Sequence, residues 1–354
     1  MNTTTYENAG VDTDREEEGL ARLIEIIKPT WPLKGIGTVK LDIGHYANVI
    51  DIGGGTGIAI SSDGVGSKVL IAQRMHRYDT VGIDCVAMNV NDLICVGAKP
   101  LSMTDYIAVQ KPIPELLAAL AQGLAEGARR AGISISGGEI AQLPEIINGD
   151  RKDYGFDLAG TAIGLVKLDR ILVGKGIKPG DVVIGIESSG LHSNGYTLAR
   201  RILEEEIEPQ KGADLGGKLL EPTHIYVKEA MALLEAHLNI KAFAHITSDG
   251  LLNLNRVESD VDYVIDKLPP VPDIFDLLQR CGSVSWAEMF QVYNMGIGFC
   301  VVLPKANAER ALNIIHKHGK KAWIIGHTEA GSRQVFVKQH GLVGVDTSFA
   351  SVAA

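Results

Sequence analysis

The chain has 354 residues, 45% of them apolar, and a formal net charge of −9. This length and apolar content predict a folded protein of two domains, and the acidic balance argues against a nucleic-acid-binding surface. No apolar run is long enough to cross a membrane, so we expect no membrane partner. The four cysteines lack CxxC spacing and the polar N-terminus resembles no signal peptide, which together predict a cytoplasmic protein with reduced thiols.

The first half of the chain alternates helix-like and strand-like segments. Apolar residues at helical spacing predict helices at 14–27, 68–75 and 81–95, and a long helix from Pro114 to about Gly132. One strand-like segment begins at Gly57, and three others span 101–109, 134–144 and 156–166. This half is therefore expected to contain several strands and three or four helices.

The second half opens between Lys167 and Pro179 with a turn and a buried type of strand at 182–187. Helices are expected from about 194, at 224–238 and at 306–319, and strands at 242–247, 298–304, 322–330 and 333–339. Residues 207–220 are predicted to be a polar connector. A further helix is expected to begin at Asp249, and the last dozen or so residues lack a clear period.

Strands alternating with helices in both halves predict a mixed α+β and α/β fold. We expect an N-terminal domain at 1–168, a C-terminal α/β domain at 169–340 and a tail at 341–354.

The first candidate site is the segment DGVGSK, from Asp63 to Lys68. A carboxylate at a strand end is a ligand that suits Mg2+, Gly64 and Gly66 let backbone amides approach a phosphate, and Lys68 adds a positive charge. The spacing is not that of a Walker A loop. On the hexamer alone, an ordinary glycine turn before a helix is the commoner case.

Acidic residues on the apolar helix at 81–95 form the second candidate. Asp84 and Asp92 are eight residues apart, about two turns, so they lie near one face of the helix. Burying either carboxylate is costly unless it is paired or bound to a metal. With Asp63 and with Asp105 on the next strand, these acids could converge on one or two Mg2+ ions. Each acid alone also fits a helix-end or surface carboxylate.

Glycine-rich loops supply the third and fourth candidates. Gly137 and Gly138 precede Glu139 after a strand, which again combines close backbone approach with a hard-metal ligand, although such a pair is more often only a turn. The segment SSGLHSNG at 188–195 lies between a strand and a helix. Its amides and hydroxyls suit a phosphate monoester, and its histidine suits proton transfer or oxyanion stabilisation. The residues concerned are Ser188, Ser189, Gly190, His192, Ser193 and Asn194. The alternative is that Ser193 or Asn194 only caps the helix.

The segment Thr247-Ser248-Asp249-Gly250 precedes another expected helix. A serine or aspartate in that position is more often an N-cap than a ligand. His245, in the strand-like AFAHIT, fits a structural histidine better than a catalytic one.

Taken together and in order, these segments resemble the phosphoribosylformylglycinamidine cyclo-ligase family, the aminoimidazole ribonucleotide synthetases. Nine collinear stretches carry the resemblance from Tyr6 to about Thr328, and VGIDCVAMNVNDL and SSGLHSNGY are the most specific. The resemblance departs where family members carry three glycines and this chain has Ser248-Asp249-Gly250, and in the region before DGVG.

The resemblance implies a homodimer of two-domain subunits that pair through the N-terminal sheet, with ATP bound in a cleft near the interface. By carry-over, Asp63, Asp92 and Glu139 hold Mg2+ and the nucleotide phosphates, with help from Lys68, Lys28 and the Gly137-Gly138 turn. His192, Ser193 and Asn194 face formylglycinamidine ribonucleotide, and His192, Asp92 and Lys68 are the expected catalytic residues.

The reaction implied is an ATP-dependent ring closure in purine biosynthesis. ATP phosphorylates the formamide oxygen, the amidine nitrogen attacks the activated carbon, and phosphate leaves to give aminoimidazole ribonucleotide. Two other functions stay open. The chain could be a nucleotide-binding or regulatory paralogue without catalysis, or a superfamily kinase or synthetase acting on another small amide or phosphate.

Overall fold

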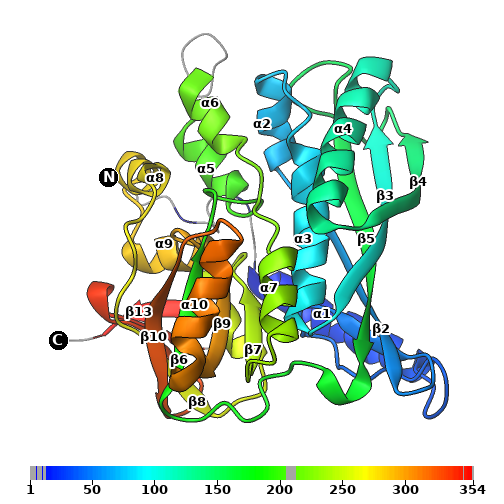
Figure 1. Cartoon of the computed structure of the whole chain (residues 1–354). Coiled ribbons are helices and arrows are strands. Elements are labelled where there is room, and N and C mark those ends of the chain that lie inside the picture. The colour runs from blue at the N-terminus through cyan, green and yellow to red at the C-terminus, as the bar shows by residue number, and fades with distance from the viewer. Residues whose placement is uncertain (1–4, 6–9, 11–12, 205–212, 346, 353–354) are drawn as a thin grey trace.

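Two mixed sheets, one in each half of the chain, organise the computed structural model (Figure 1). The structure describes residues 5, 10, 13–204, 213–345 and 347–352. The mixed α/β architecture expected from the sequence is confirmed. No helix in these ranges is both long and apolar enough to span a bilayer.

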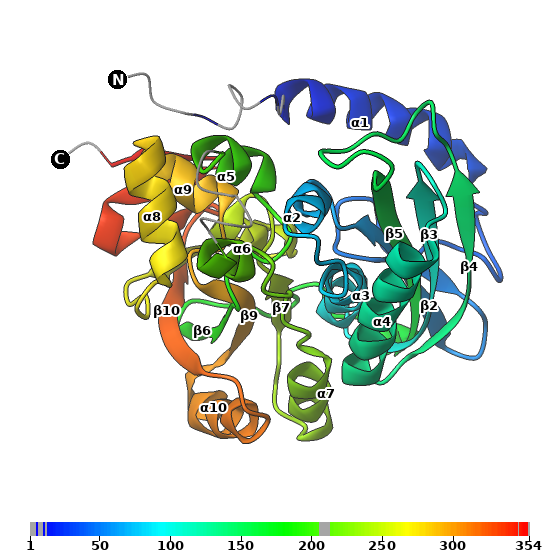
Figure 2. The same cartoon turned by 90° about the horizontal axis from the view of Figure 1, so that it is seen from above.

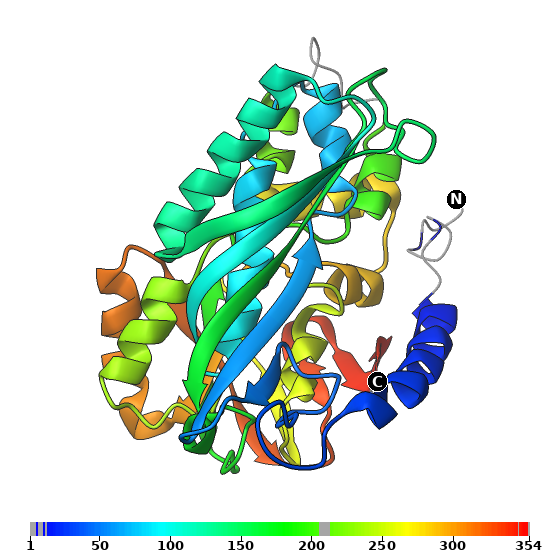
Figure 3. The same cartoon turned by 90° about the vertical axis from the view of Figure 1, so that its right-hand side faces the viewer.

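The first sheet has five strands in the order β1-β2-β5-β3-β4, and only the β3–β4 pair is parallel. The strands are β1 (Asn48–Asp51), β2 (Thr56–Gly64), β3 (Lys99–Val109), β4 (Ser134–Gln142) and β5 (Phe156–Lys167). Helices α3 (Val81–Cys95) and α4 (Pro114–Ala131) cover one face, whereas Figure 3 looks onto the other face, which no helix of the described residues covers. The helix predicted at 81–95 has those bounds in the structure, because nearly all of its side chains are buried.

The second sheet has eight strands in the order β13-β12-β11-β8-β10-β6-β9-β7. Its strands are β6 (Asp181–Glu187), β7 (Ala242–His245), β8 (Val261–Ile265), β9 (Ile297–Pro304), β10 (Ala322–Ala330), β11 (Val335–Val337), β12 (Leu342–Val345) and β13 (Ser348–Ser351). Helices α7 (Val227–Glu235) and α10 (Ala308–Lys317) lie on one side, and α5 (Tyr196–Ile202), α8 (Asp273–Gly282) and α9 (Trp286–Val292) lie on the other (Figure 2).

Three sequence expectations need correction. The segment expected to be a tail, 341–354, contributes β12 and β13, because Leu342 and Phe349 bury their side chains and the strands complete an antiparallel pair. The described part of the polar connector expected at 207–220 contains a helix, α6 (Ala213–Leu219). The helix expected from Asp249 is a 3-10 helix, Gly250–Arg256.

Helix α3 belongs to the first half of the chain but also hydrogen-bonds to the second half. Asp84 accepts hydrogen bonds from the backbone amide and the hydroxyl of Thr223. Asn91 donates to the carbonyl of His224 and accepts from the amide of Tyr226. These buried bonds fix the two sheets against a common helix, and the candidate site lies along it.

Candidate active site

Four residues form a row across the first sheet. Asp63 on β2 pairs with Gly160 on β5, Gly160 pairs with Asp105 on β3, and Asp105 pairs with Gly138 on β4. Directly paired residues on neighbouring strands point to the same face of a sheet. The two carboxylates therefore project from the same face, on either side of a glycine. A Cβ at Gly138 would lie 2.4 Å from the Asp105 carboxylate, so only glycine leaves that carboxylate its place.

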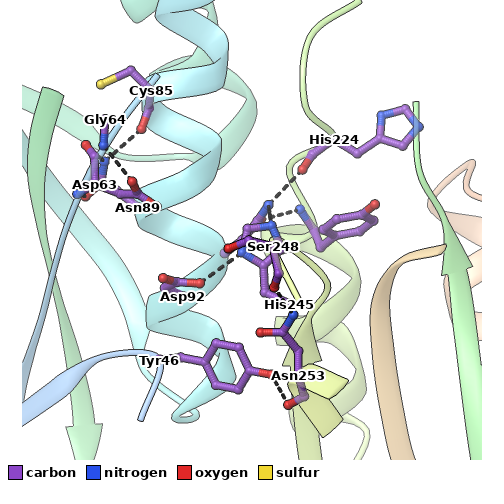
Figure 4. Close-up of polar contacts among 12 residues, drawn as sticks. Tyr46, Asp63, Gly64, Cys85, Asn89, Asp92, His224, His245, Ser248 and Asn253 are labelled. Carbon is purple, nitrogen blue, oxygen red and sulfur yellow. Dashed lines mark hydrogen bonds and ion pairs between the residues drawn. The ribbon is translucent and has the colours of Figure 1, made fainter. Parts of the chain in front are cut away.

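Asp63 is held at the end of β2 by helix α3 (Figure 4). The Asn89 side chain accepts from the amide of Asp63 at 3.0 Å and donates to its carbonyl at 3.1 Å. The Asp63 carboxylate accepts from the amide of Gly64 at 2.7 Å. Burial and then the negative charge of Asp92 raise the pKa of Asp63 to about 6. A nearby cation would favour the ionised form of Asp63.

The raised pKa of Asp63 predicts a pH dependence of stability in the absence of divalent cations. Between the ordinary aspartate value and about 6, the folded chain binds a proton that the unfolded chain has lost, so stability falls as the pH rises through this window. We expect Asp63→Asn to flatten this part of a melting-temperature profile recorded in EDTA from pH 4 to 7. An unchanged profile would place the titration on another group.

Asp92 is paired with a histidine of the second sheet. Its Oδ1 lies 2.9 Å from Nδ1 of His245, whose ring is fully buried on β7 (Figure 4). The Asn91 side chain lies 3.4 Å from Nε2 of the same ring. The sequence favoured a structural histidine here but gave no sign of its partner, because 153 residues separate the two.

The structure does not assemble the predicted metal ligands Asp63, Asp92 and Glu139 within one chain. Glu139 follows Gly138 on β4 and pairs with Tyr106, so by strand alternation it points to the face opposite Asp63 and Asp105. Its side chain is exposed there. Within the described residues, no group of three His, Cys, Asp or Glu side chains is arranged to hold a metal ion. The charge of Asp92 acts on Asp63, whereas the side chain of Glu139 lies on the opposite face.

Lys68 does not extend toward a phosphate site. Its ammonium is fully buried and donates to Asp84 Oδ1 at 2.9 Å, to the carbonyl of His192 at 2.9 Å and to the carbonyl of Glu221 at 2.7 Å. Burial lowers the pKa of Lys68, and the neighbouring Asp84 opposes that shift. All three ammonium protons are used within the protein, and the role of Lys68 as a nucleotide or catalytic lysine stays a prediction.

The two glycine-rich loops, at 63–68 and 188–195, lie against each other. A Cβ on Gly66, whose φ is +68°, would lie 3.9 Å from the carbonyl oxygen of Ser193. The hydroxyls of Ser67 and Thr197 are 3.1 Å apart. Lys68 joins the loops through the carbonyl of His192. The sequence predicted both loops, and the structure brings them together.

Most polar groups of the 188–195 loop are engaged within the protein. Ser188 donates to the side chain of Asn294, and Ser189 donates to the carbonyl of Pro222. The Ser193 hydroxyl lies 3.3 Å from that of Thr223. Neither Ser193 nor Asn194 caps α5, because its N-cap is Gly195. The loop hydroxyls therefore do not form the open phosphate site that the sequence suggested.

His192 is buried at a left-handed backbone position, with φ of 65°. Its Nε2 accepts from the amide of Ser189 at 3.2 Å, and burial holds the pKa of the ring well below its ordinary value. The ring is thus neutral, with its proton on Nδ1. That atom and Asn194 Nδ2 are buried donors without an acceptor in the described part of the chain. Two unpaired donors on one loop call for an acceptor, which a polar substrate would supply.

Lys28 and Asp249, which precedes the 3-10 helix Gly250–Arg256, have partners outside the two glycine-rich loops. Lys28 donates to Asp42 at 2.7 Å and is exposed, so the structure gives its charge a protein partner. Asp249 occupies the N-cap position with φ of 70°, but its side chain makes no capping hydrogen bond. It lies instead 3.8 Å from Arg256.

Two cavities meet at Asp105. One, of about 420 Å³, is lined by the row of Asp63, Gly160 and Asp105 and by Ser62, Thr104, Tyr106 and Thr161, whose side chains by strand alternation point to the uncovered face. The other, of about 660 Å³, is mostly apolar and lies between α4 and strands β3 and β4. The two cavities therefore lie on opposite faces of the sheet at Asp105.

Comparison with known proteins places the chain in a family. The models of the AIR synthase related protein N-terminal and C-terminal domains match residues 44–166 and 178–339. A phosphoribosylformylglycinamidine cyclo-ligase from Methanothermobacter thermautotrophicus is 44% identical, over 93% of this chain and 95% of the relative. One from Pyrococcus horikoshii is 43% identical, over 96% of this chain and 99% of the relative. The chain belongs to the phosphoribosylformylglycinamidine cyclo-ligase family.

Solved structures share the fold of this family member at lower identity. A Thermus thermophilus protein superposes with a TM-score of 0.62 at 21% identity, covering 90% of this chain and 95% of that one. The thiamine-monophosphate kinase of Stenotrophomonas maltophilia gives a TM-score of 0.58 at 19% identity, covering 83% and 89%. At these identities the likeness concerns the fold alone.

Proposed function

We propose that this chain is the ATP-dependent ligase that closes the imidazole ring of aminoimidazole ribonucleotide in purine biosynthesis. The observation that carries the proposal is the match to curated cyclo-ligases at 43–46% identity over nearly the whole chain. The chain also carries Asp63, Asp92 and Asp105 in positions fixed by hydrogen bonds and strand pairing, and such acidic groups suit an enzyme that uses Mg-ATP.

ATP is proposed to bind at the first sheet, with its phosphates beside Asp63. Asp63 and Asp92 would hold Mg2+, since burial and the charge of Asp92 raise the cost of ionising Asp63 in the absence of a cation. The ion would supply charge neutralisation for the triphosphate. The remaining ligands would come from phosphate oxygens and water, as is usual for this ion.

The proposed chemistry needs no covalent intermediate with the protein. The formamide oxygen of formylglycinamidine ribonucleotide forms a bond to the γ-phosphorus of ATP, and ADP leaves. The amidine nitrogen then forms a bond to the formyl carbon and loses a proton. The carbon–oxygen bond breaks and inorganic phosphate departs. The protein contributes positioning and charge neutralisation, which account for most catalysis of phosphoryl transfer.

The 188–195 loop is proposed to face the reacting end of the substrate. The unpaired Nδ1–H of His192 and the unpaired Nδ2 of Asn194 are fixed hydrogen-bond donors. Because His192 is neutral, it is proposed to hold a developing negative charge by a hydrogen bond rather than to deliver a proton. This changes the role expected from the sequence, where proton transfer was equally open.

We also propose that the enzyme is a cytoplasmic homodimer that pairs through the uncovered face of the first sheet (Figure 3). The partly exposed large side chains of this sheet include Leu101, Tyr106, Ile163 and Leu165. An apolar patch on a sheet is typical of a protein interface. All four cysteines are free, as expected for a reducing compartment.

The test is ADP release by the purified chain with Mg-ATP, with and without formylglycinamidine ribonucleotide, alongside an assay of aminoimidazole ribonucleotide. We expect ADP formation to depend on the substrate and to match the product one for one. ATP binding without product would contradict the ligase and favour a regulatory paralogue. Substrate-independent ATP hydrolysis would point to another acceptor.

A further inference from the structure

A small basic cavity lies between α2 (Lys68–Arg74) and α5, and the proposed mechanism does not use it. It measures about 280 Å³ and is lined by Arg74, Thr197, Arg200, Arg201 and Glu204. The last four of these are spaced at helical intervals along and just beyond α5, so they share one side of that segment. The cavity therefore has a face supplied by α5 and an opposing arginine at the end of α2.

The positive charges of this cavity are only partly neutralised. Arg74 is paired with Asp150 and lies 3.8 Å from Glu204. The buried Nε of Arg200 has no acceptor within the described residues. Burial lowers the pKa of this guanidinium, while the nearby charge of Asp150 raises it. Arg201 is exposed, and no ion pair of it is found in the described chain. The buried Nε of Arg200 is thus left to a ligand, because an unpaired buried donor is uncommon in a native protein without one.

The cavity adjoins the loop that is proposed to face the substrate. Helix α5 begins directly after Gly195, and Thr197 in its first turn contacts Ser67 of the other glycine-rich loop. The three serine hydroxyls of the 188–195 loop are engaged within the protein, as described above. The loop therefore leaves a substrate phosphate without hydroxyl donors, whereas the adjoining cavity offers several cationic ones.

We propose that this cavity, lined by Arg74, Thr197, Arg200 and Arg201, binds the 5′-phosphate of the ribonucleotide substrate. The inference rests on the proposed function, which supplies a substrate that carries a phosphate monoester. Guanidinium groups bind phosphate oxygens through paired N–H donors, and three of them outweigh the single lining carboxylate of Glu204. The volume is below the range of about 300–1,000 Å³ usual for sites that enclose a whole ligand, which suits a phosphate group alone.

Steady-state kinetics of Arg200→Gln test the proposal in the full-length chain. We expect kcat/KM for formylglycinamidine ribonucleotide to fall by about tenfold to a hundredfold, the range for losing a hydrogen bond to a charged group, while KM for ATP stays within about twofold. Arg310→Gln, on the exposed side of α10, is the matched control and should change neither value. If Arg200→Gln does not fold, Arg201→Gln, at an exposed position of the same cavity, replaces it.

Calorimetric titration with ribose 5-phosphate, ribose and inorganic phosphate separates this proposal from the proposed function. Ribose 5-phosphate should bind to the wild-type chain, and ribose should not. The substrate should displace the bound ribose 5-phosphate from the wild-type chain. Arg200→Gln should bind little ribose 5-phosphate, so the substrate should displace little from it. Phosphate binding that depends on Arg200 but survives saturating substrate would mean a separate anion site and overturn the inference. So would an unaltered kcat/KM in a folded variant with normal ring-closing activity. If the wild-type chain makes no product, binding of ribose 5-phosphate through Arg200 still supports the cavity, and its absence overturns it.

Discussion

Replacing Lys68 by methionine is expected to lower the free energy of unfolding by about 3–5 kcal/mol, because the change leaves Asp84 as an uncompensated buried charge. Both side chains of this pair are fully buried. The substitution also removes the donor that binds the carbonyls of His192 and Glu221. Urea denaturation followed by circular dichroism measures the loss.

The matched control is Lys317→Met, at an exposed position of α10, which should stay within about 0.5 kcal/mol of the wild type. Exchanging Asp84 for leucine in the Lys68→Met background should recover part of the loss, since it removes the unpaired charge. A Lys68→Met protein of normal stability with a raised KM for ATP would return this lysine to the phosphate role expected from the sequence.

Asp92→Asn is expected to reduce Mg-ATP-dependent turnover by more than about a hundredfold, since changes even in residues behind a metal ligand cost about 10–100-fold. The amide keeps an oxygen that can accept from Nδ1 of His245, so the fold should persist. Initial rates at several Mg2+ concentrations, with thermal melting of the same samples, measure both effects.

Two further variants separate the chemistry from the structure. Asp92→Ala should lose turnover like the asparagine variant but also lose about 1–3 kcal/mol of stability, because it leaves the buried ring of His245 without its acceptor. Asp260→Asn, at an exposed position, should change neither quantity. Normal turnover by Asp92→Asn would remove this residue from the active site.

Local patterns predicted the elements of the fold well where one physical signal dominated. The helix at 81–95 was predicted with its bounds because its apolar residues recur at helical spacing over the whole segment. The C-terminal strands were missed because β12 and β13 are short, and each buries few side chains. A short strand is stabilised mainly by pairing with a neighbouring strand, and a local sequence pattern does not indicate that neighbour.

The candidate site shows the same division. The two glycine-rich loops could be predicted from their residues, but the partners of their side chains could not. Lys68 and Asp84 are 16 residues apart, and no sequence period indicates that they meet in the core. The orientation of Glu139 could have been inferred, since strand alternation sends Gly138 and Glu139 to opposite faces. The helical spacing of Thr197, Arg200 and Arg201 is a further signal in the sequence, since it places the three on one side of a helix.

The position of α3 has a consequence for any attempt to divide this protein. A fragment that stops at the end of the first sheet would retain Asp84 and Asn91 but lose Thr223, the backbone of His224 and that of Tyr226, to which these side chains bond. Helix α3 of that fragment would then expose to water the polar side chains and the apolar side that are buried in the full chain. We therefore expect the two halves to fold as one cooperative unit. The active site along α3 would then form when the chain folds, and ligand binding would not be needed to bring the two halves into contact.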